Sequence, residues 1–288
     1  MAAGEVNLLP EPNGRISMKK RFLMSAAAAT ALFAGPAAAE FTLNILHIND
    51  LHSRIESVNK YDSTCSAEDE TEGKCFGGVA RLKTLIDTKR SELEGQNVIT
   101  LDAGDQFQGS LMYTTYKGAA EAEFMEMIGF DVMAVGNHEF DDGPAALAAF
   151  VENVSFPVIS GNLDLANEAL LKDKVGNHVV LEVGGEKIGI ISALATDTAE
   201  TSSPGENVVF EDEIEALKAD VAALEAEGVN KIIALTHVGL PVDIQIATAV
   251  PGIDLVVGGH SHTYLSASDP KRKGAYPTYA SQEDGTLV

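Results

Sequence analysis

Five short polar clusters, each placed where an extended apolar run ends, constrain this 288-residue chain more than any other feature. The apolar runs span residues 41–48, 98–101, 132–135, 232–235 and 255–257. The clusters are Asp50-Leu51-His52, Gly104-Asp105, Gly136-Asn137-His138-Glu139, His237 and Gly259-His260-Ser261-His262. The ends of successive strands meet at one rim of an α/β sheet, so we expect these side chains to converge there.

Helical patterns alternate with the extended runs. One apolar helical face spans residues 79–93, and the clearest helix is Glu211–Glu227, which Gly228 ends. Gly143-Pro144 predicts another helix start, because proline is favoured at the first helical position. Residues 179–191 predict a hairpin with a two-residue Gly-Gly turn. The alternation predicts a layered α/β domain with mostly parallel strands.

The composition excludes some partners. The net charge is −23 and no basic stripe is visible, which argues against a nucleic acid polymer as partner. With 45% hydrophobic residues the chain can bury a substantial core. An acidic protein can still bind a small anion where metal ions reverse the local charge.

Residues 18–39 have the pattern of a secretory signal peptide. The basic start at residues 18–21 precedes the apolar, small-residue stretch 22–35, and Ala37-Ala38-Ala39 supplies a cleavage site. A transmembrane anchor is the alternative, but this segment is short and alanine-rich for a span. We therefore expect residues 1–17 to be an upstream extension. The mature protein is expected in the periplasm or outside the cell, without a membrane span.

Cys65 and Cys75 are the two cysteines of the chain, and they lie ten positions apart in a polar segment. A disulfide would close a small loop and agrees with export. A metal site is the weaker alternative, because no third cysteine is available to complete it.

The types of side chain in the clusters point to metal binding. Asp50 and His52 lie two apart, so on an extended stretch both would point to the same side, and His260 and His262 repeat that spacing. Gly104 allows a sharp turn that presents a carboxylate. Taken singly, a solvated aspartate or a core histidine is the commoner explanation. Together, the five clusters contain a full ligand set for two divalent ions.

The order of the clusters resembles that of the calcineurin-like metallophosphoesterases, with the pattern D-x-H, G-D, G-N-H-[DE], a single H and G-H-x-H. Residues 46–52, 102–109 and 136–141 are similar to the secreted 5′-nucleotidase and UDP-sugar hydrolase branch. The resemblance covers about residues 41–288. It implies a layered β-sandwich flanked by helices for residues 40–288. It also implies that the chain stops before a C-terminal domain of the full-length protein that selects the substrate.

The resemblance implies two metal sites that share one carboxylate. One ion would be held by Asp50, His52, Asp105 and His262. The other would be held by Asp105, Asn137, His237 and His260. Many members of the nucleotidase branch have Gln or Asn in place of His262, so the metal pair stays open among Zn, Mn, Co and Fe or Mg.

The same resemblance assigns the remaining polar residues of these motifs. His138 would stabilise the transition state and help the leaving oxygen depart, with Asp141 as its hydrogen-bonded partner. Asn137 would approach the substrate. Asn162, outside these motifs in Gly161-Asn162-Leu163-Asp164, is a further candidate for contact with the substrate phosphate, although a turn explains it at least as well. We expect His47 to have a core or supporting place, and His178 to face solvent.

The implied activity is hydrolysis of nucleotide phosphate esters, by in-line attack of a water that two metal ions activate. Activity on 2′,3′-cyclic nucleotides, 3′-nucleotides or UDP-sugars stays open as an alternative. A secreted metal-binding module without activity is an alternative of another class. Retention of His138 and Asp141 argues against that module, because storing metal requires neither residue.

Overall fold

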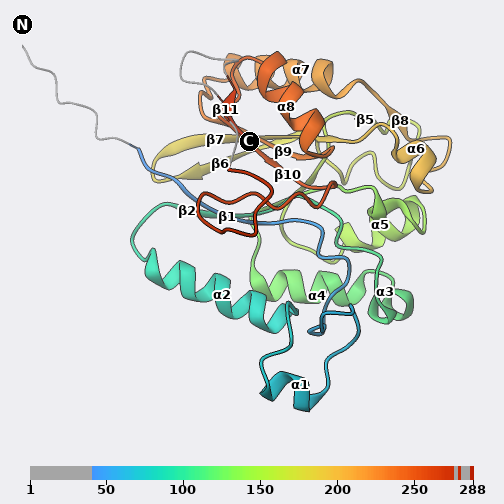
Figure 1. Ribbon diagram of the computed structural model, residues 1–288. Coiled ribbons are helices and arrows are strands. Elements are labelled where there is room, and N and C mark those ends of the chain that lie inside the picture. The colour runs from blue at the N-terminus through green and yellow to red at the C-terminus, as the bar shows by residue number, and fades with distance from the viewer. Residues whose placement is uncertain (1–40, 276–277, 280–285) are drawn as a thin grey trace, which may run out of the picture. The chain divides into compact units, whose positions relative to one another are not determined.

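Two β-sheets form the central layers of the computed structural model (Figure 1), which describes residues 41–275, 278–279 and 286–288. The first sheet is parallel and has the strand order β1-β2-β3-β4. Its strands are β1 (Asn44–Ile48), β2 (Val98–Asp102), β3 (Val132–Ala134) and β4 (Val158–Ile159). The signal peptide and the upstream extension predicted before residue 40 lie outside the described residues.

The second sheet is mixed and has the strand order β11-β12-β10-β9-β7-β6. Its strands are β6 (His178–Val183), β7 (Glu186–Leu194), β9 (Ile232–His237), β10 (Leu255–Gly258), β11 (Thr278–Tyr279) and β12 (Thr286–Leu287). The predicted hairpin is confirmed, since β6 pairs antiparallel with β7 across Gly184-Gly185. A small antiparallel pair consists of β5 (Leu163–Asp164) and β8 (Val209–Phe210).

Helices cover the outer faces of the two sheets. In Figure 1, α2 (Val79–Glu92) and α4 (Ala119–Ile128) lie on the first sheet, and α7 (Glu213–Ala226) and α8 (Leu240–Ala249) lie on the second. The shorter helices are α1 (Ala67–Thr71), α3 (Leu111–Tyr116), α5 (Pro144–Val151), α6 (Thr198–Thr201) and the 3₁₀ turn η1 (His138–Phe140). The predicted layered sandwich flanked by helices is therefore confirmed. Within the described ranges, no helix combines the length and the apolar character that crossing a membrane requires.

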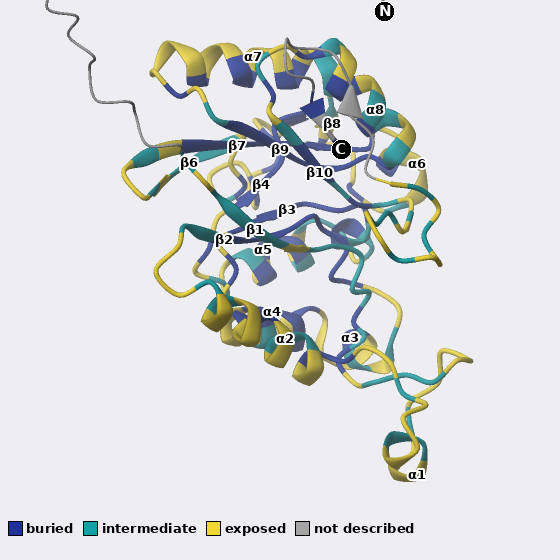
Figure 2. Ribbon diagram, turned by 60° about the vertical axis from the view of Figure 1, so that its left-hand side comes forward, coloured by how far each residue is buried: buried dark blue, intermediate teal, exposed yellow. Residues whose placement is uncertain are grey.

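Local sequence signals account for the ends of these helices. The Asp212 side chain accepts a hydrogen bond from the Glu215 backbone N–H, so α7 begins two residues later than predicted. Gly228, with φ of +77°, follows the last turn as predicted. Pro144 occupies the first turn of α5, directly after Gly143. One stripe of α7 is buried against the second sheet, and Figure 2 shows β3, β7 and β9 as largely buried, whereas β1 and β6 are intermediate.

Cys65 and Cys75 form the predicted disulfide. The bridge closes a loop that carries α1, at the margin of the fold in Figure 2. Glu70 lies near both sulfur atoms, but the two sulfurs are bonded to each other and offer no thiolate to a metal. The cysteines therefore serve the loop rather than a metal site.

Replacing Cys65 with serine should lower stability by about 2–3 kcal/mol, because the open loop regains conformational entropy in the unfolded chain. Thermal denaturation of the variant and of reduced wild-type protein should give similar midpoints. Metal content should stay unchanged in both samples. A large loss of bound metal on Cys65→Ser would contradict a purely structural role.

Candidate metal centre

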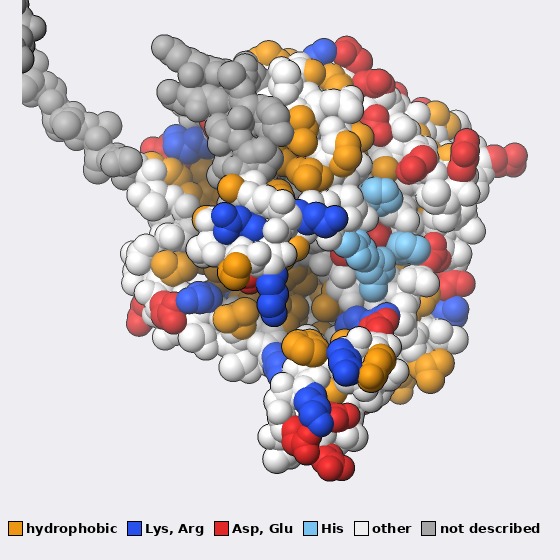
Figure 3. Space-filling view, in the orientation of Figure 1, with side chains coloured by type: hydrophobic (Ala, Val, Ile, Leu, Met, Phe, Trp, Pro, Cys, Tyr) orange, Lys and Arg blue, Asp and Glu red, His pale blue; other side chains and the backbone are white. Residues whose placement is uncertain are grey.

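The five predicted clusters meet at one edge of the two sheets. In Figure 3 several histidine side chains gather in one group on the surface. The convergence follows from the strand directions: β1 and β2 run parallel, as do β9 and β10, and each cluster lies at or after the carboxyl end of its strand. His237 is the last residue of β9 rather than the residue after it.

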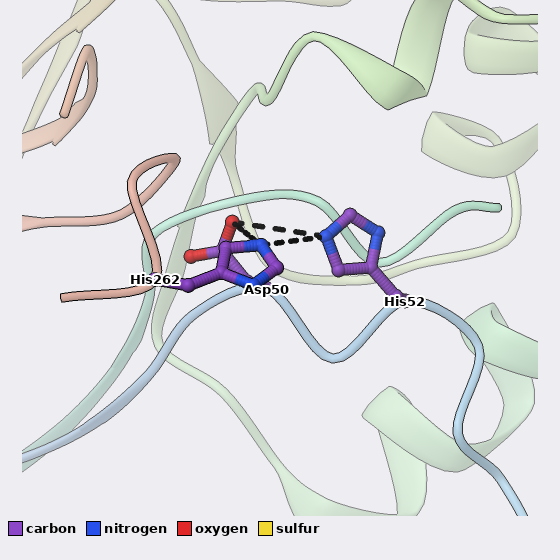
Figure 4. Close-up of side chains that lie close together, drawn as sticks. All are labelled: Asp50, His52 and His262. Carbon is purple, nitrogen blue, oxygen red and sulfur yellow. Dashed lines mark hydrogen bonds and ion pairs between the residues drawn. The ribbon is translucent and has the colours of Figure 1, made fainter. Parts of the chain in front are cut away.

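Asp50, His52 and His262 form one group of possible ligand atoms (Figure 4). Nε2 of His262 lies 3.2 Å from Oδ1 of Asp50, and Nε2 of His52 lies 3.8 Å from the same oxygen. The two imidazole Nε2 atoms are 3.1 Å apart. Asp50 is fixed from behind, since both of its carboxylate oxygens accept the backbone N–H of His260. All three side chains therefore point toward one position.

Asp105, His237 and His260 form a second group of possible ligand atoms within 4.8 Å of one another. Oδ2 of Asp105 lies 3.0 Å from Nε2 of His237 and 3.8 Å from Nε2 of His52, so this carboxylate stands between the two groups. Asn137 adds an amide oxygen that lies 2.9 Å from Nδ1 of His260. The structure thus brings together every residue that the sequence nominated as a ligand.

The buried part of the site fits a bound cation. His237 is fully buried, and its Nδ1 lies 2.6 Å from the Ala103 carbonyl oxygen, to which it can donate. Its Nε2 has no hydrogen-bond partner among the described residues, although a carboxylate oxygen of Asp105 is close. Burial alone would lower the pKa of His237, but Asp105 outweighs burial and raises it to about 9. The pair therefore favours a positive charge, which a divalent cation supplies without that proton.

Several candidate ligand residues have an unusual backbone. Asp50, His52, Asp105, His260 and His262 all have φ between +48° and +75°. Non-glycine residues adopt this left-handed region rarely, and such residues cluster at functional sites. The extended geometry expected for the two D-x-H and H-x-H spacings is therefore wrong. Their side chains converge because the backbone turns, not because an extended strand places both on one side.

Glu139 is the supporting residue that sequence reasoning did not single out. Its fully buried carboxylate accepts backbone N–H groups from two loops. Oε1 accepts from Gln106 and Phe107 at 2.8 and 3.1 Å, and Oε2 accepts from Asp105 and Gly136 at 3.0 and 2.7 Å. Glu139 thus binds the loop after β2 to the loop after β3. Its place in G-N-H-E was visible, but an acceptor of backbone donors has no distinguishing sequence signal.

His138 and Asp141 form a hydrogen-bonded pair beside the ligand groups. Nδ1 of His138 lies 2.7 Å from Oδ2 of Asp141, and the backbone N–H of His138 donates to Oδ1 of Asp105 at 2.9 Å. The rings of His138 and His52 lie edge to face, with centroids 5.1 Å apart. Because Nδ1 is engaged by a carboxylate, the other ring nitrogen is the one available at the site.

Three sequence expectations need correction. Asn162 is fully buried, and its amide bonds the backbone of Leu194 and Glu211, so its polar groups are engaged within the protein rather than offered to a substrate. His178 does not simply face solvent, because Nδ1 lies 2.9 Å from a buried carboxylate oxygen of Asp220. His47 is exposed in β1 rather than in a core position. Asn162 and His178 each serve contacts between segments distant in sequence, which local patterns do not encode.

Comparison with known proteins agrees with the family resemblance found in the sequence. A family model described as calcineurin-like phosphoesterase matches residues 43–264. The 5′-nucleotidases of Mus musculus and Homo sapiens are each 44% identical to the chain, over 88% of it and 44% of their own length. The chain thus spans less than half the length of these curated relatives.

Solved structures agree with this likeness. The 5′-nucleotidase precursor from Thermus thermophilus is 41% identical, with a TM-score of 0.77 over 86% of this chain and 48% of that one. The NAD nucleotidase of Haemophilus influenzae is 32% identical, with a TM-score of 0.74 over 85% of this chain and 44% of that one.

Changing Glu139 to glutamine should weaken metal binding, because an amide NH₂ would replace one of the two accepting oxygens. Two backbone N–H groups would lose their acceptor, at a cost of about 1–3 kcal/mol each. Titration with Mn²⁺, followed by calorimetry, should show lower affinity and lower stability of the metal-free protein. Glu123→Gln, on the exposed face of α4, is the matched control and should change neither quantity. Unchanged affinity in Glu139→Gln would contradict the supporting role.

Proposed function

The chain belongs to the calcineurin-like phosphoesterase family, and from that premise we propose that it is a 5′-nucleotidase-like hydrolase of nucleotide phosphate esters that uses two divalent cations. The carrying observation is the buried Nε2 of His237, which has no hydrogen-bond partner among the described residues and faces the Asp105 carboxylate at 3.0 Å. A buried polar atom without a partner is costly, and metal coordination removes that cost. The similarity to nucleotidases supports nucleotides as the proposed substrate class.

The proposed ligands divide into two sets that share Asp105. One set is Asp50, His52, Asp105 and His262, and the other is Asp105, Asn137, His237 and His260. When bound, two such cations activate a water molecule and stabilise the charge that develops on the phosphoryl oxygens. Imidazole suits Zn and Fe, whereas carboxylate and amide oxygens suit Mn and Mg, so the mixed donor set leaves Zn, Mn, Co and Fe or Mg open.

Local charge explains how a protein of net charge −23 would bind an anion. Two divalent cations carry four positive charges, of which the carboxylates of Asp50 and Asp105 cancel half. The neutral amide of Asn137 completes a ligand set without a further negative charge. The remaining positive charge would attract a phosphate dianion despite the acidic surface.

His138 is the proposed catalytic group of the chain itself. Donation of Nδ1–H to Asp141 holds the ring in one tautomer, which leaves the other nitrogen to serve the leaving oxygen. The backbone N–H of His138 donates to the shared carboxylate of Asp105, so the His138 ring and the proposed ligands keep one geometry.

Export and a second domain complete the proposal. The signal-peptide pattern of residues 18–39 and the Cys65–Cys75 disulfide support a location in the periplasm or outside the cell. The length of the relatives, more than twice that of the match, supports a further domain that recognises the nucleoside.

His138→Ala and Asp105→Asn should separate rate from metal binding. His138→Ala should keep both cations and lose about 10²–10⁴-fold in kcat, the usual contribution of general acid–base catalysis. Asp105→Asn should lose or scramble both cations, because one amide oxygen cannot bridge them. Metal content by mass spectrometry, measured with kcat, distinguishes the two. Loss of metal from His138→Ala would show that His138 is itself a ligand.

The substrate preference of residues 40–288 should be broad. With added Mn²⁺, Co²⁺ or Zn²⁺, this chain should hydrolyse an activated aryl phosphate and discriminate little among AMP, UMP and UDP-glucose. Binding energy from a remote nucleoside orients the phosphate, and the domain proposed to supply it is not part of this span. Strong preference for one nucleoside would place recognition in these residues. Folded, metal-replete protein without any activity would refute the proposed function.

A further inference from the structure

The segment after β7 brings a hydroxyl group to the far side of the His138–Asp141 pair. Asp141 accepts from Nδ1 of His138 with one carboxylate oxygen, Oδ2, at 2.7 Å. Its other oxygen, Oδ1, accepts a hydrogen bond from Oγ of Ser202 at 2.9 Å. The three side chains therefore form a continuous chain of hydrogen bonds that ends at the catalytic imidazole.

We propose that Ser202 is a positioning residue that acts on His138 through Asp141, an inference that rests on the proposed function. The torsion that rotates a carboxylate about its own axis has broad minima, so a single bond to His138 leaves Asp141 free to turn. A second bond to the other oxygen fixes the plane of the carboxylate. Ser202 thereby holds Oδ2 toward Nδ1 and keeps the imidazole aligned with the leaving oxygen.

The backbone places Ser202 independently of its hydroxyl group. The Ser202 N–H donates to the Thr198 carbonyl at 3.0 Å, and the Ser203 N–H donates to the Phe140 carbonyl at 3.2 Å. The second bond ties the segment to the turn that directly precedes Asp141. Loss of the Ser202 hydroxyl should therefore leave the segment in place, and its effect should reach catalysis through Asp141 rather than through unfolding.

The partial burial of this bond makes it effective. Asp141 and Ser202 are both half-buried, so water competes less well for the carboxylate than it would at the surface. A hydrogen bond to a charged group contributes more than one between neutral groups. The neighbouring Ser203 is exposed, and no hydrogen bond of its hydroxyl is found within the described part of the chain.

The test compares Ser202→Ala, Ser202→Thr and the matched control Ser203→Ala, each loaded with Mn²⁺, on two aryl phosphates. Phenyl phosphate has a poor leaving group that needs a proton, whereas 2,4-dinitrophenyl phosphate has one that leaves as the anion. Ser202→Ala should lose about tenfold in kcat on phenyl phosphate. It should keep KM and metal content, and lose little on the dinitrophenyl ester. Ser202→Thr should restore the rate, and Ser203→Ala should match wild type.

A second background shows whether Ser202 acts through Asp141. In Asp141→Ala protein, adding Ser202→Ala should change kcat little further, because the group that transmits the effect is absent. Equal loss on both esters, or independent losses that multiply, would overturn the inference and leave Ser202 with a structural role only.

Proton NMR separates this inference from the proposed function. In protein loaded with diamagnetic Zn²⁺, the hydrogen-bonded Nδ1–H of His138 should give a downfield resonance that Ser202→Ala shifts or broadens and Ser203→Ala does not. An unchanged resonance would overturn the inference even in an active enzyme. Wild-type protein with this signature but without phosphatase activity would instead refute the proposed function.

Discussion

The geometry of the site depends on the hydrogen bonds that the buried carboxylate of Glu139 accepts. This carboxylate collects backbone N–H groups from the loops after β2 and β3, and these loops present Asp105 and Asn137. The two loops lie so close together that a Cβ atom on Gly136 would stand 2.3 Å from Oδ1 of Asp105. A glycine there is therefore a steric requirement. The Glu139 carboxylate thereby joins the two loops beyond the ends of β2 and β3, where the pairing of the strands has ended.

The strands and the hairpin could be predicted from sequence because each has a local signal, and the candidate ligand residues stand in recognisable polar clusters. Apolar runs followed by polar residues marked β1 and β9, and the Gly-Gly pair marked the turn between β6 and β7. The disulfide was predictable because the chain has only two cysteines. The meeting of the five clusters at one edge was predictable because parallel strands end at the same edge, whereas the convergence of side chains within D-x-H and H-x-H depends on the left-handed backbone.

Contacts between distant segments could not be predicted in this way. Asn162 bonds the backbone of β7, and Ser202 reaches Asp141 from a segment 61 residues further along the chain. The local sequence around either residue does not distinguish it from a polar residue in an ordinary turn. The left-handed backbone of Asp50 and His52 was also hidden, because no glycine announces it. These features depend on tertiary packing, which fixes hydrogen-bond partners only once the sheets are in place.

The left-handed backbone at five of the proposed ligand residues would link cation binding to conformational stability. Each such residue costs roughly 1–3 kcal/mol, which the surrounding structure must offset. A ligand that binds only the folded state adds to stability in proportion to the logarithm of its free concentration. The supply of divalent cations around the protein would therefore affect the stability of the folded state as well as the rate of turnover. Scarcity of metal would then lower the amount of folded protein in addition to its activity.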